Sequence, residues 1–267
     1  MNDSIRRFAI GDIHGCAKAL RGLIEEIAPR PQDEVIFMGD YVDRGPNSKD
    51  VVDQIIDLQN RCNVIALRGN HEIMLMGVAL AGMDDKVWQA NGGRATVTSY
   101  GGSLAKIPAA HLAFFQELLP YYETPSEIFV HANYHPLLDM HQQIDMTTYW
   151  EHLTERPPLA HKSGKRVFVG HTPQPTGNVL DVGHLVCLDT YCFGGRYLTA
   201  FNLGTDEILQ ADFHGHLRRP SLLTFNGPLG ILWTKTMAYF KGRIERTRTP
   251  APETAECAAP ASPVSTD

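Results

Sequence analysis

The sequence predicts a mixed α/β fold, on three observations. Several short apolar runs end abruptly in polar clusters that contain glycine, and helical patterns lie between the first of these runs. After residue 165 the rhythm changes to closely spaced strands without helical patterns. Short runs rich in Val, Ile and Phe are typical of buried strands. Alternating strands and helices indicate parallel βαβ units in the first part of the chain.

Five apolar runs carry the strand prediction. They are FAI (8–10), VIFM (35–38), VIAL (64–67), IFV (128–130) and VFV (167–169). Each run leads directly into a polar cluster. In open α/β sheets, ligands bind beyond the carboxyl ends of the strands. If the five strands share one sheet, the polar clusters meet at one edge of it.

Helices are predicted by the spacing of apolar residues. The first has apolar residues at i, i+3, i+4 and i+7 from Leu20 and is ended by Pro29, and the second begins at Asn47 or Ser48. Residues 75–125 look helical and irregular. The strands after residue 165 (RVFVGHT, HLVCLDT, YLTAFNL and EILQADF) predict a second, mostly antiparallel sheet.

Composition narrows the class of protein. The chain of 267 residues is 43% hydrophobic and 20% charged, which is typical of a globular protein. A net charge of -6 disfavours nucleic acid as a partner. Five cysteines without zinc-ribbon spacing, no apolar signal core and no run of ~18 apolar residues predict a cytoplasmic protein.

The chain is predicted to divide into three parts. Residues 1–220 form the main domain, 221–246 form an arm or helix, and 247–267, rich in Pro, Ala, Thr and Ser, form a disordered tail. Peripheral membrane contact through 221–244, with Trp233 and Lys235 at the boundary, is the less favoured interpretation of the arm. We expect a monomer.

Eight polar residues follow the five strands: Asp12, His14, Asp40, Asp43, Asn70, His71, His131 and His171. Carboxylates gathered at one point repel one another, and divalent cations remove that conflict. Two ions with one bridging carboxylate would use six protein ligands and clamp a phosphoryl group. The ligand types suit Mn, Fe, Zn or Mg, and Mn²⁺ is the first choice for assays in vitro.

The same motifs resemble a known family. GDIHG (11–15), GDYVDRG (39–45) and RGNHE (68–72) are similar to the three signatures of the metal-dependent serine/threonine protein phosphatases, and HAN (131–133) and GHTP (170–173) to later ones. The nearest pattern is the bacterial and phage lambda-phosphatase-like branch of the calcineurin-like metallophosphoesterases. The resemblance covers about residues 8–203. It implies a four-layer α/β/β/α sandwich.

The resemblance also implies roles for individual residues. One metal would be held by Asp12, His14, Asp40 and His171, with Asp40 bridging to a second metal held by Asn70 and His131. His71 would protonate the leaving alkoxide, and Asp43 would orient His71. Arg44 would bind the phosphate oxygens, and Asn70 could also touch them. Glu72 would support the site by hydrogen bonding.

Two roles leave alternatives open. The phage pattern places a second phosphate-binding arginine two residues after a tryptophan, but Trp150 is followed by His152 at that position. Arg94 or Arg156 would then bind phosphate, or the role is lost. His184 is a rival to His171 as a metal ligand.

The expected activity is hydrolysis of phosphoserine or phosphothreonine, with phosphotyrosine as a further substrate, by a metal-bridging hydroxide. The partner would be a phosphoprotein or phosphopeptide. The first alternative is a dinucleoside polyphosphate hydrolase on the same scaffold. Glu72, Asp43 and Arg44 favour the protein phosphatase over that alternative.

A second alternative, a catalytically dead metal-binding adaptor, should have lost His71 or a metal ligand, and none is missing. The spacing C-x₅-R at Cys62 to Arg68 encloses a strand-like run, which argues against a cysteine-dependent phosphatase.

Overall fold

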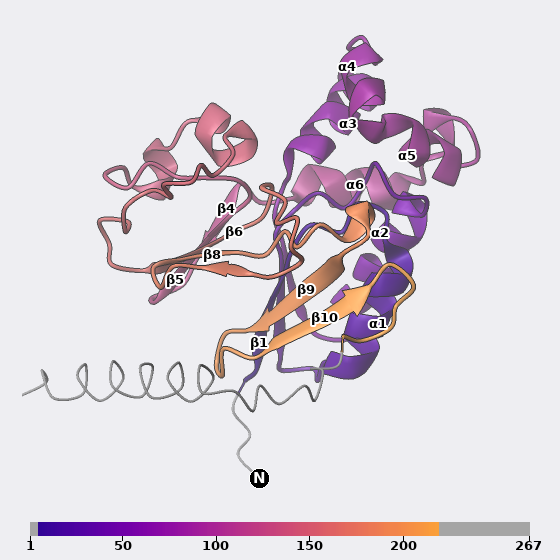
Figure 1. Ribbon diagram of the computed structural model, residues 1–267. Coiled ribbons are helices and arrows are strands. Elements are labelled where there is room, and N and C mark those ends of the chain that lie inside the picture. The colour runs from indigo at the N-terminus through magenta and orange to yellow at the C-terminus, as the bar shows by residue number, and fades with distance from the viewer. Residues whose placement is uncertain (1–4, 219–267) are drawn as a thin grey trace, which may run out of the picture. The chain divides into compact units, whose positions relative to one another are not determined.

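A computed structural model describes residues 5–218, which belong to one compact unit of the chain (Figure 1). The predicted arm at 221–246 and the predicted tail at 247–267 lie outside the described residues. The domain boundary at residue 220 therefore stays a prediction. No helix among residues 5–218 combines the length and apolar character that crossing a membrane requires.

The strands form two five-stranded sheets. The first sheet has the order β10-β9-β1-β2-β3 and contains β1 (Arg7–Ile10), β2 (Glu34–Phe37), β3 (Asn63–Ala66), β9 (Tyr197–Asn202) and β10 (Ile208–Asp212). The second has the order β4-β5-β6-β8-β7 and contains β4 (Tyr121–Glu123), β5 (Glu127–Val130), β6 (Arg166–Val169), β7 (Leu180–Asp181) and β8 (Leu185–Cys187). Parallel pairing joins β1 to β2 to β3, and β5 to β6 to β8.

Helices occupy the connections. The α-helices are α1 (Ala17–Ile27), α2 (Ser48–Gln59), α3 (Asn70–Ala81), α4 (Lys86–Trp88), α5 (Arg94–Ser99) and α6 (Ala109–Glu117). Shorter turns are η1 (Gln89–Gly93), η2 (Leu104–Lys106), η3 (Met140–Gln142), η4 (Met146–Trp150) and η5 (Cys192–Gly194). The two helices predicted before residue 60 are present. The first ends at a left-handed Ala28, with φ of 44°, directly before Pro29.

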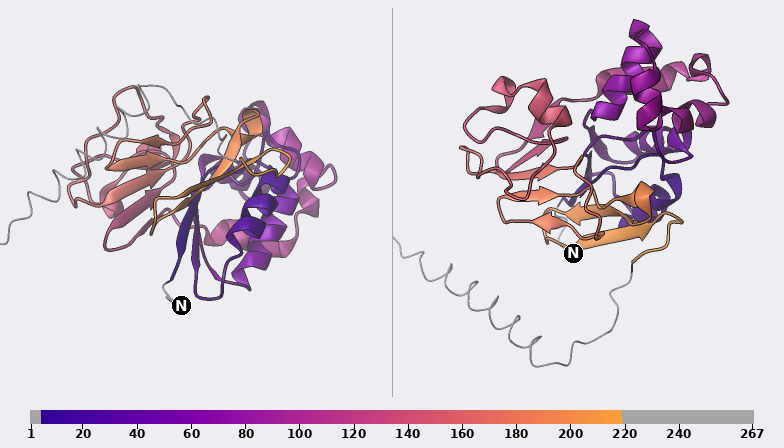
Figure 2. Two further views of the ribbon diagram at one scale, coloured as in Figure 1. Left: turned by 60° about the horizontal axis from the view of Figure 1, so that its bottom comes forward. Right: turned by 45° about the horizontal axis from the view of Figure 1, so that its top comes forward.

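Three apolar clusters of buried residues lie between the layers of the fold. Figures 1 and 2 show the two sheets side by side, with α1 and α2 against the first. One cluster packs α1 and α2 against the first sheet, and the second lies between the two sheets, where Ile36 meets Phe129 and Phe168. The third covers the outer face of the second sheet with residues such as Tyr134 and Met140. The four-layer prediction is therefore confirmed. The outermost layer on that face consists of η3, η4 and loops rather than full helices.

The predicted antiparallel second sheet is wrong. Among the strands after residue 165, β6 and β8 pair in parallel within the second sheet. Strands β9 and β10 form an antiparallel pair, but they extend the first sheet beside β1. Local spacing shows that a strand exists, whereas its partner is decided by distant apolar faces. Phe201 of β9, for example, is buried between the sheets.

The five strands that precede the polar clusters do not share one sheet. Strands β1, β2 and β3 belong to the first sheet, whereas β5 and β6 belong to the second. The polar clusters still meet, because the two sheets stack with their relevant strand ends together. His131, after β5, donates a hydrogen bond from Nδ1 to the carbonyl oxygen of Met38, after β2, at 2.8 Å.

Away from the strand ends, a buried carboxylate ties the start of the first sheet to α1. Asp33 is fully buried and accepts from the side chains of Arg6 and Arg30 at distances of 2.5–3.3 Å. Burial raises the pKa of Asp33, but hydrogen bonds from Arg30 and Arg6 outweigh burial and hold the pKa well below its usual range. Asp33 therefore stabilises the folded state in its charged form.

We expect Asp33→Asn to lower the free energy of unfolding by about 1–3 kcal/mol at pH 7, since a buried charged hydrogen-bond network loses its acceptor. A folded pKa below the unfolded value of about 4 means that this contribution is present above pH 4 and shrinks as the pH falls through the folded pKa. Urea unfolding of both proteins between pH 3 and pH 7 measures it. If the difference in the free energy of unfolding between the wild type and Asp33→Asn grew toward pH 3, this account would be contradicted.

Candidate metal centre

Two groups of buried residues at the strand ends have the donor atoms of a metal site. One contains His14, Asp40 and His71, and the other contains Asp40, His131 and His171, with donor atoms within 4.8 Å of one another. Asp40 belongs to both groups. Its Oδ2 lies 3.4 Å from Nε2 of His14, and its Oδ1 lies 3.4 Å from Nε2 of His131. One carboxylate thus presents a different oxygen to each side, which is the arrangement that a bridging ligand needs.

His14 and His131, which lie nearest to Asp40, are held in a ligating tautomer. Nδ1 of His14 donates to the carbonyl oxygen of Val42 at 2.8 Å, and Nδ1 of His131 donates to that of Met38 at 2.8 Å. Each ring therefore carries its proton on Nδ1 and a lone pair on Nε2. Backbone acceptors of this kind commonly orient histidines that ligate metals.

The structure corrects the expected position of His171. Its Nδ1 lies 3.1 Å from Oδ1 of Asn70, and the same oxygen lies 3.1 Å from Nε2 of His131. These three side chains converge on one point. The ring of His171 therefore groups with Asn70 and His131, whereas the backbone amide of His171 donates to Oδ2 of Asp12 at 2.9 Å. The family resemblance identified His171 as a candidate ligand, but only the structure shows which side chains lie next to its ring.

Buried polar atoms at this place lack protein partners. Among the described residues, Oδ1 of Asp12, Nε2 of His71 and Nε2 of His171 are buried without a hydrogen bond. Such atoms are rare because leaving them unpaired costs free energy. Carboxylate oxygens and imidazole nitrogens are suitable ligands for borderline divalent cations. The residues therefore fit the binding of divalent cations.

Two glycines make room for the carboxylates. A Cβ added at Gly69 would lie 2.1 Å from Oδ1 of Asp40, and one added at Gly170 would lie 2.0 Å from Oδ1 of Asp12. Both distances are far inside van der Waals contact. The glycines of the RGN and GHT motifs are thus required by the close approach of a carboxylate to the backbone.

Backbone strain is concentrated at the same place. Of the eight non-glycine residues with positive φ in the described part of the chain, five are predicted site residues: His14, Asp40, Asp43, Arg44 and His171. Left-handed conformations are costly for residues with a Cβ, and they persist where the surrounding structure enforces them. The concentration supports a functional role for these turns.

His71 is held by Asp43. Nδ1 of His71 donates to Oδ2 of Asp43 at 2.6 Å, and that carboxylate also accepts from Nε1 of Trp88 at 2.8 Å and from the hydroxyl of Thr96 at 2.6 Å. Burial lowers the pKa of His71, but the charges of Asp40 and Asp43 outweigh burial and raise it above its ordinary value. The ring is thereby oriented with Nε2 unpartnered and facing Asp40, 3.9 Å from its Oδ2.

Glu72 has the supporting position that was predicted. Its carboxylate accepts from the backbone amides of Asp40 at 2.9 Å, Tyr41 at 2.9 Å and Gly69 at 3.0 Å. These bonds join the turn after β2 to the start of α3. Burial and the nearby charge of Asp40 raise the pKa of Glu72 to about 8. Its role is to hold both turns that carry the candidate ligands.

Arg44 lies directly beside the candidate metal ligands. Its Nη1 donates to Nε2 of His14 at 2.9 Å, and its guanidinium carbon lies 4.6 Å from the ring centre of Phe193. Its backbone amide donates to the carbonyl oxygen of Gly92 at 3.2 Å. The guanidinium therefore lies at the candidate centre, between a candidate ligand and an aromatic ring.

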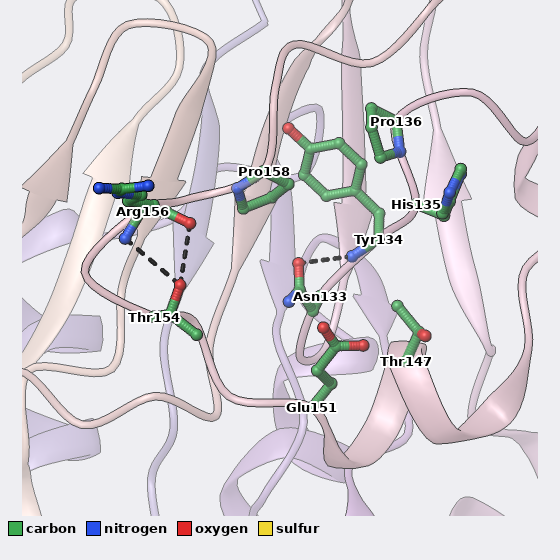
Figure 3. A pocket seen from close by; sticks show the side chains of 9 residues that line it. All are labelled: Asn133, Tyr134, His135, Pro136, Thr147, Glu151, Thr154, Arg156 and Pro158. Atoms are coloured by element: carbon green, nitrogen blue, oxygen red, sulfur yellow. Dashed lines mark hydrogen bonds between the residues drawn. The ribbon is translucent and has the colours of Figure 1, made fainter.

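Within residues 5–218, Arg94 and Arg156 make no comparable contact with the candidate ligands. Arg94 is exposed at the start of α5, and Arg156 is exposed beside a pocket of about 220 Å³. Figure 3 shows Arg156 at one edge of this pocket, separated from Glu151 and Tyr134. Their predicted role in binding phosphate stays a prediction.

His152 occupies the position where the resemblance implied an arginine. Its ring stacks on that of His171, with centres 4.3 Å apart and planes 18° apart. His184, the rival to His171, lies elsewhere: its Nε2 donates to the carbonyl oxygen of Pro158 at 2.8 Å. It precedes β8, at the opposite strand end from the metal centre. Cys62 precedes β3 and Arg68 follows it, so no phosphate-binding loop joins them.

Sequence reasoning missed three residues of the site. Asp189 is buried with its Oδ2 unpartnered, and its charge contributes to raising the pKa of Asp12, after burial itself. Trp88 and Thr96 hold Asp43. Asp189 follows β8 as the other ligands follow their strands, so the same rule could have identified it. Trp88 and Thr96 carry no such signal.

Comparison with known proteins shows the family to which this candidate metal centre and fold belong. The family model described as calcineurin-like phosphoesterase matches residues 5–219, and the chain belongs to that family. The metallophosphoesterases of this family use divalent metal ions, and the buried groups of Asp and His around Asp40 fit such ions. The fold implied by the resemblance is confirmed at this level, whereas its protein-phosphatase branch is not.

The curated relatives carry a more particular name. A symmetrical bis(5'-nucleosyl)-tetraphosphatase of Janthinobacterium sp. (strain Marseille) is 38% identical over 73 residues, which is 27% of this chain and 26% of that protein. One of Burkholderia pseudomallei (strain 668) is 41% identical over 71 residues, 27% of this chain and 24% of that protein. The chain thus matches about a quarter of the length of these relatives.

Solved structures share the fold. A provisionally assigned diadenosine tetraphosphatase has a TM-score of 0.61 at 22% identity, covering 79% of this chain and 94% of that one. A cold-active protein tyrosine phosphatase has a TM-score of 0.59 at 15% identity, covering 80% and 78%. At these identities the likeness shows the fold alone.

Proposed function

We propose that the protein hydrolyses dinucleoside polyphosphates, with diadenosine tetraphosphate as the representative substrate. The observation that carries the proposal is the name shared by the curated relatives, which are 38% and 41% identical over the matched segments. The buried ligand set around Asp40 supports it, because hydrolysis of a polyphosphate needs concentrated positive charge. The sequence motifs favoured phosphoproteins as substrates over dinucleoside polyphosphates, and this proposal reverses that preference.

The candidate ligands for the cations are Asp12, His14 and Asp40 on one side, and Asp40, Asn70, His131 and His171 on the other. Bound divalent ions supply Lewis-acid chemistry toward phosphate oxygens and lower the pKa of water. Mn, Fe, Zn and Mg all suit these donors. In this proposal, Arg44 binds and orients the phosphate whose P–O bond to the leaving group breaks.

His71 has the geometry to deliver a proton to the leaving oxygen. Asp43 fixes Nδ1, so Nε2 is the atom directed at the reacting group. A nucleotide leaving through a phosphate oxygen is a far weaker base than the alkoxide of serine, so it depends less on a proton donor. The importance of His71 should therefore differ between the two substrate classes.

Hydrolysis of phosphoproteins is the second candidate. The specific observation in its favour is the Asp43–His71 pair beside Arg44, since a strongly oriented proton donor serves an alkoxide leaving group best. The family fold also hosts a protein tyrosine phosphatase. Phosphoserine, phosphothreonine and phosphotyrosine peptides are the substrates to test.

The direct test compares turnover of diadenosine tetraphosphate with that of a phosphoserine peptide on Mn²⁺-loaded protein, with products separated by chromatography. Symmetrical hydrolysis releases two molecules of ADP from each dinucleotide. We expect kcat/KM for the dinucleotide to exceed that for the peptide by more than about tenfold, equivalent to 1.4 kcal/mol. A preference for the peptide would reject the proposal in favour of the second candidate.

A further inference from the structure

The loop between β8 and β9 brings an aromatic residue to the metal centre. Phe193, in η5, is half-buried. Its ring lies edge-on to the ring of His14, with centres 4.9 Å apart, and the guanidinium carbon of Arg44 lies 4.6 Å from its centre. This residue is thus in contact with both a candidate metal ligand and the candidate phosphate-binding arginine.

The loop is held in a defined conformation. Tyr191 adopts a left-handed φ of 63°, its amide donates to Oδ1 of Asp189 at 3.0 Å, and its carbonyl oxygen accepts from the amide of Arg196 at 3.0 Å. Its ring packs against that of Phe193, with centres 4.8 Å apart. A Cβ added at Gly194 would lie 2.1 Å from the ring of Tyr191. Close packing therefore leaves Phe193 little freedom to move away from Arg44.

The other side-chain partner of Arg44 is not permanent. Its Nη1 donates to Nε2 of His14 at 2.9 Å, and that nitrogen is the lone-pair donor left by the bond from Nδ1 to Val42. A nitrogen that ligates a cation cannot also accept from a guanidinium. In the metal-loaded protein, Arg44 loses this hydrogen bond. Among residues 5–218, the face of Phe193 is then the side-chain contact that its guanidinium keeps.

We propose that Phe193 is a positioning residue for phosphate binding: its ring holds the guanidinium of Arg44 beside the metal centre once His14 ligates a cation. A guanidinium over an aromatic face is attracted by the ring quadrupole. An arginine already restrained loses less side-chain entropy when it binds phosphate. The inference rests on the proposed role of Arg44, but not on the identity of the substrate.

Phosphate affinity tests the proposal. We compare Phe193→Leu with Phe193→Tyr on Mn²⁺-loaded protein, using inorganic phosphate in calorimetric titrations and as an inhibitor of p-nitrophenyl phosphate hydrolysis. Phe193→Leu should weaken phosphate binding by about 2- to 30-fold, the range of a cation–π contact. KM should rise by a similar factor with kcat little changed, as expected for lost binding that ground and transition states share. Phe193→Tyr should restore the wild-type values.

A double-mutant cycle separates positioning from general damage. If the ring acts through Arg44, Phe193→Leu should cause no further loss in the Arg44→Ala protein. Phe213→Leu is the matched control, since Phe213 is also half-buried but lies after β10, beside His214. Its phosphate affinity should be that of the wild type. Phe193→Met gives a second non-aromatic variant of similar volume if the leucine variant folds poorly.

Three results would overturn the proposal: unchanged phosphate affinity in both non-aromatic variants, a tyrosine variant as weak as the leucine variant, or a full loss that persists without Arg44. Unchanged phosphate binding in Arg44→Ala would also reject it, because the ring would then have no phosphate ligand to position. The probe is inorganic phosphate. If the protein does not hydrolyse dinucleoside polyphosphates, these phosphate affinities therefore still test the role of Phe193.

Discussion

Replacing His71 with Asn is expected to lower kcat for an alkyl phosphate or a phosphoserine peptide by about 10²–10⁴-fold, the usual contribution of a general acid. Nε2 of His71 is unpartnered beside Asp40, and Nδ1 is fixed by Asp43 at 2.6 Å. Asn lacks an ionisable proton at that position. The decrease should be smaller for diadenosine tetraphosphate, because its leaving group is a weaker base. Steady-state kinetics on each substrate measure both effects.

Measuring the metal content of His71→Asn, and comparing it with a control variant at another histidine, separates loss of the proton donor from loss of metal. His71→Asn should retain the wild-type metal content, because His71 is predicted to donate a proton rather than to ligate. His184→Asn is the control: His184 lies at the opposite strand end and bonds only to the carbonyl oxygen of Pro158 among the described residues. It should keep both metal and activity. Unchanged activity in His71→Asn would show that another group protonates the leaving oxygen.

Replacing Asp40 with Ala should remove metal from both sites. Its two oxygens face His14 and His131 separately, each at 3.4 Å, and Asp40 is the residue that the two groups of candidate ligands share. Lewis-acid stabilisation by bound metal is worth several kcal/mol, and each 1.36 kcal/mol is tenfold in rate. We therefore expect kcat/KM to fall by at least about 10²-fold, and elemental analysis after dialysis to find less than one ion per chain.

Asp57→Ala is the matched control for this variant. Asp57 is exposed on α2 and takes no part in the candidate centre. Its metal content and activity should equal those of the wild type. If Asp40→Ala kept two ions per chain at wild-type affinity, the bridging role of Asp40 would be wrong.

The elements of the fold could be predicted where local patterns decide them. Short apolar runs such as 35–38, followed at once by glycine and charge, favour buried strands, and α1 shows the apolar spacing of one buried face. The candidate ligands were found because each follows such a strand. Position after a strand is a sequence property, so the residue list could be made without coordinates.

The assignment of strands to sheets could not be predicted in this way. Strands β6 and β9 both read as short apolar runs, yet they lie in different sheets because of which apolar face each buries. The same limit applies to His171. Its separation from Asn70 by 101 positions says nothing about ring orientation, and the 3.1 Å contact depends on how the sheets stack.

Residues that act through others were also missed. Trp88 supports Asp43 from a short helix, and Phe193 touches Arg44 from a loop that reads as an ordinary turn. An aromatic residue in such a segment is more simply explained as core. Only the distances to charged groups distinguish the two interpretations.

The central claim is that one buried carboxylate joins two cation sites. Anomalous diffraction from crystals grown with Mn²⁺ tests it most directly, because it locates each ion independently of activity. We predict two peaks about 3.5–4 Å apart, with Asp40 between them, one beside Asp12 and His14 and the other beside Asn70, His131 and His171. A single peak, or peaks away from Asp40, would contradict it.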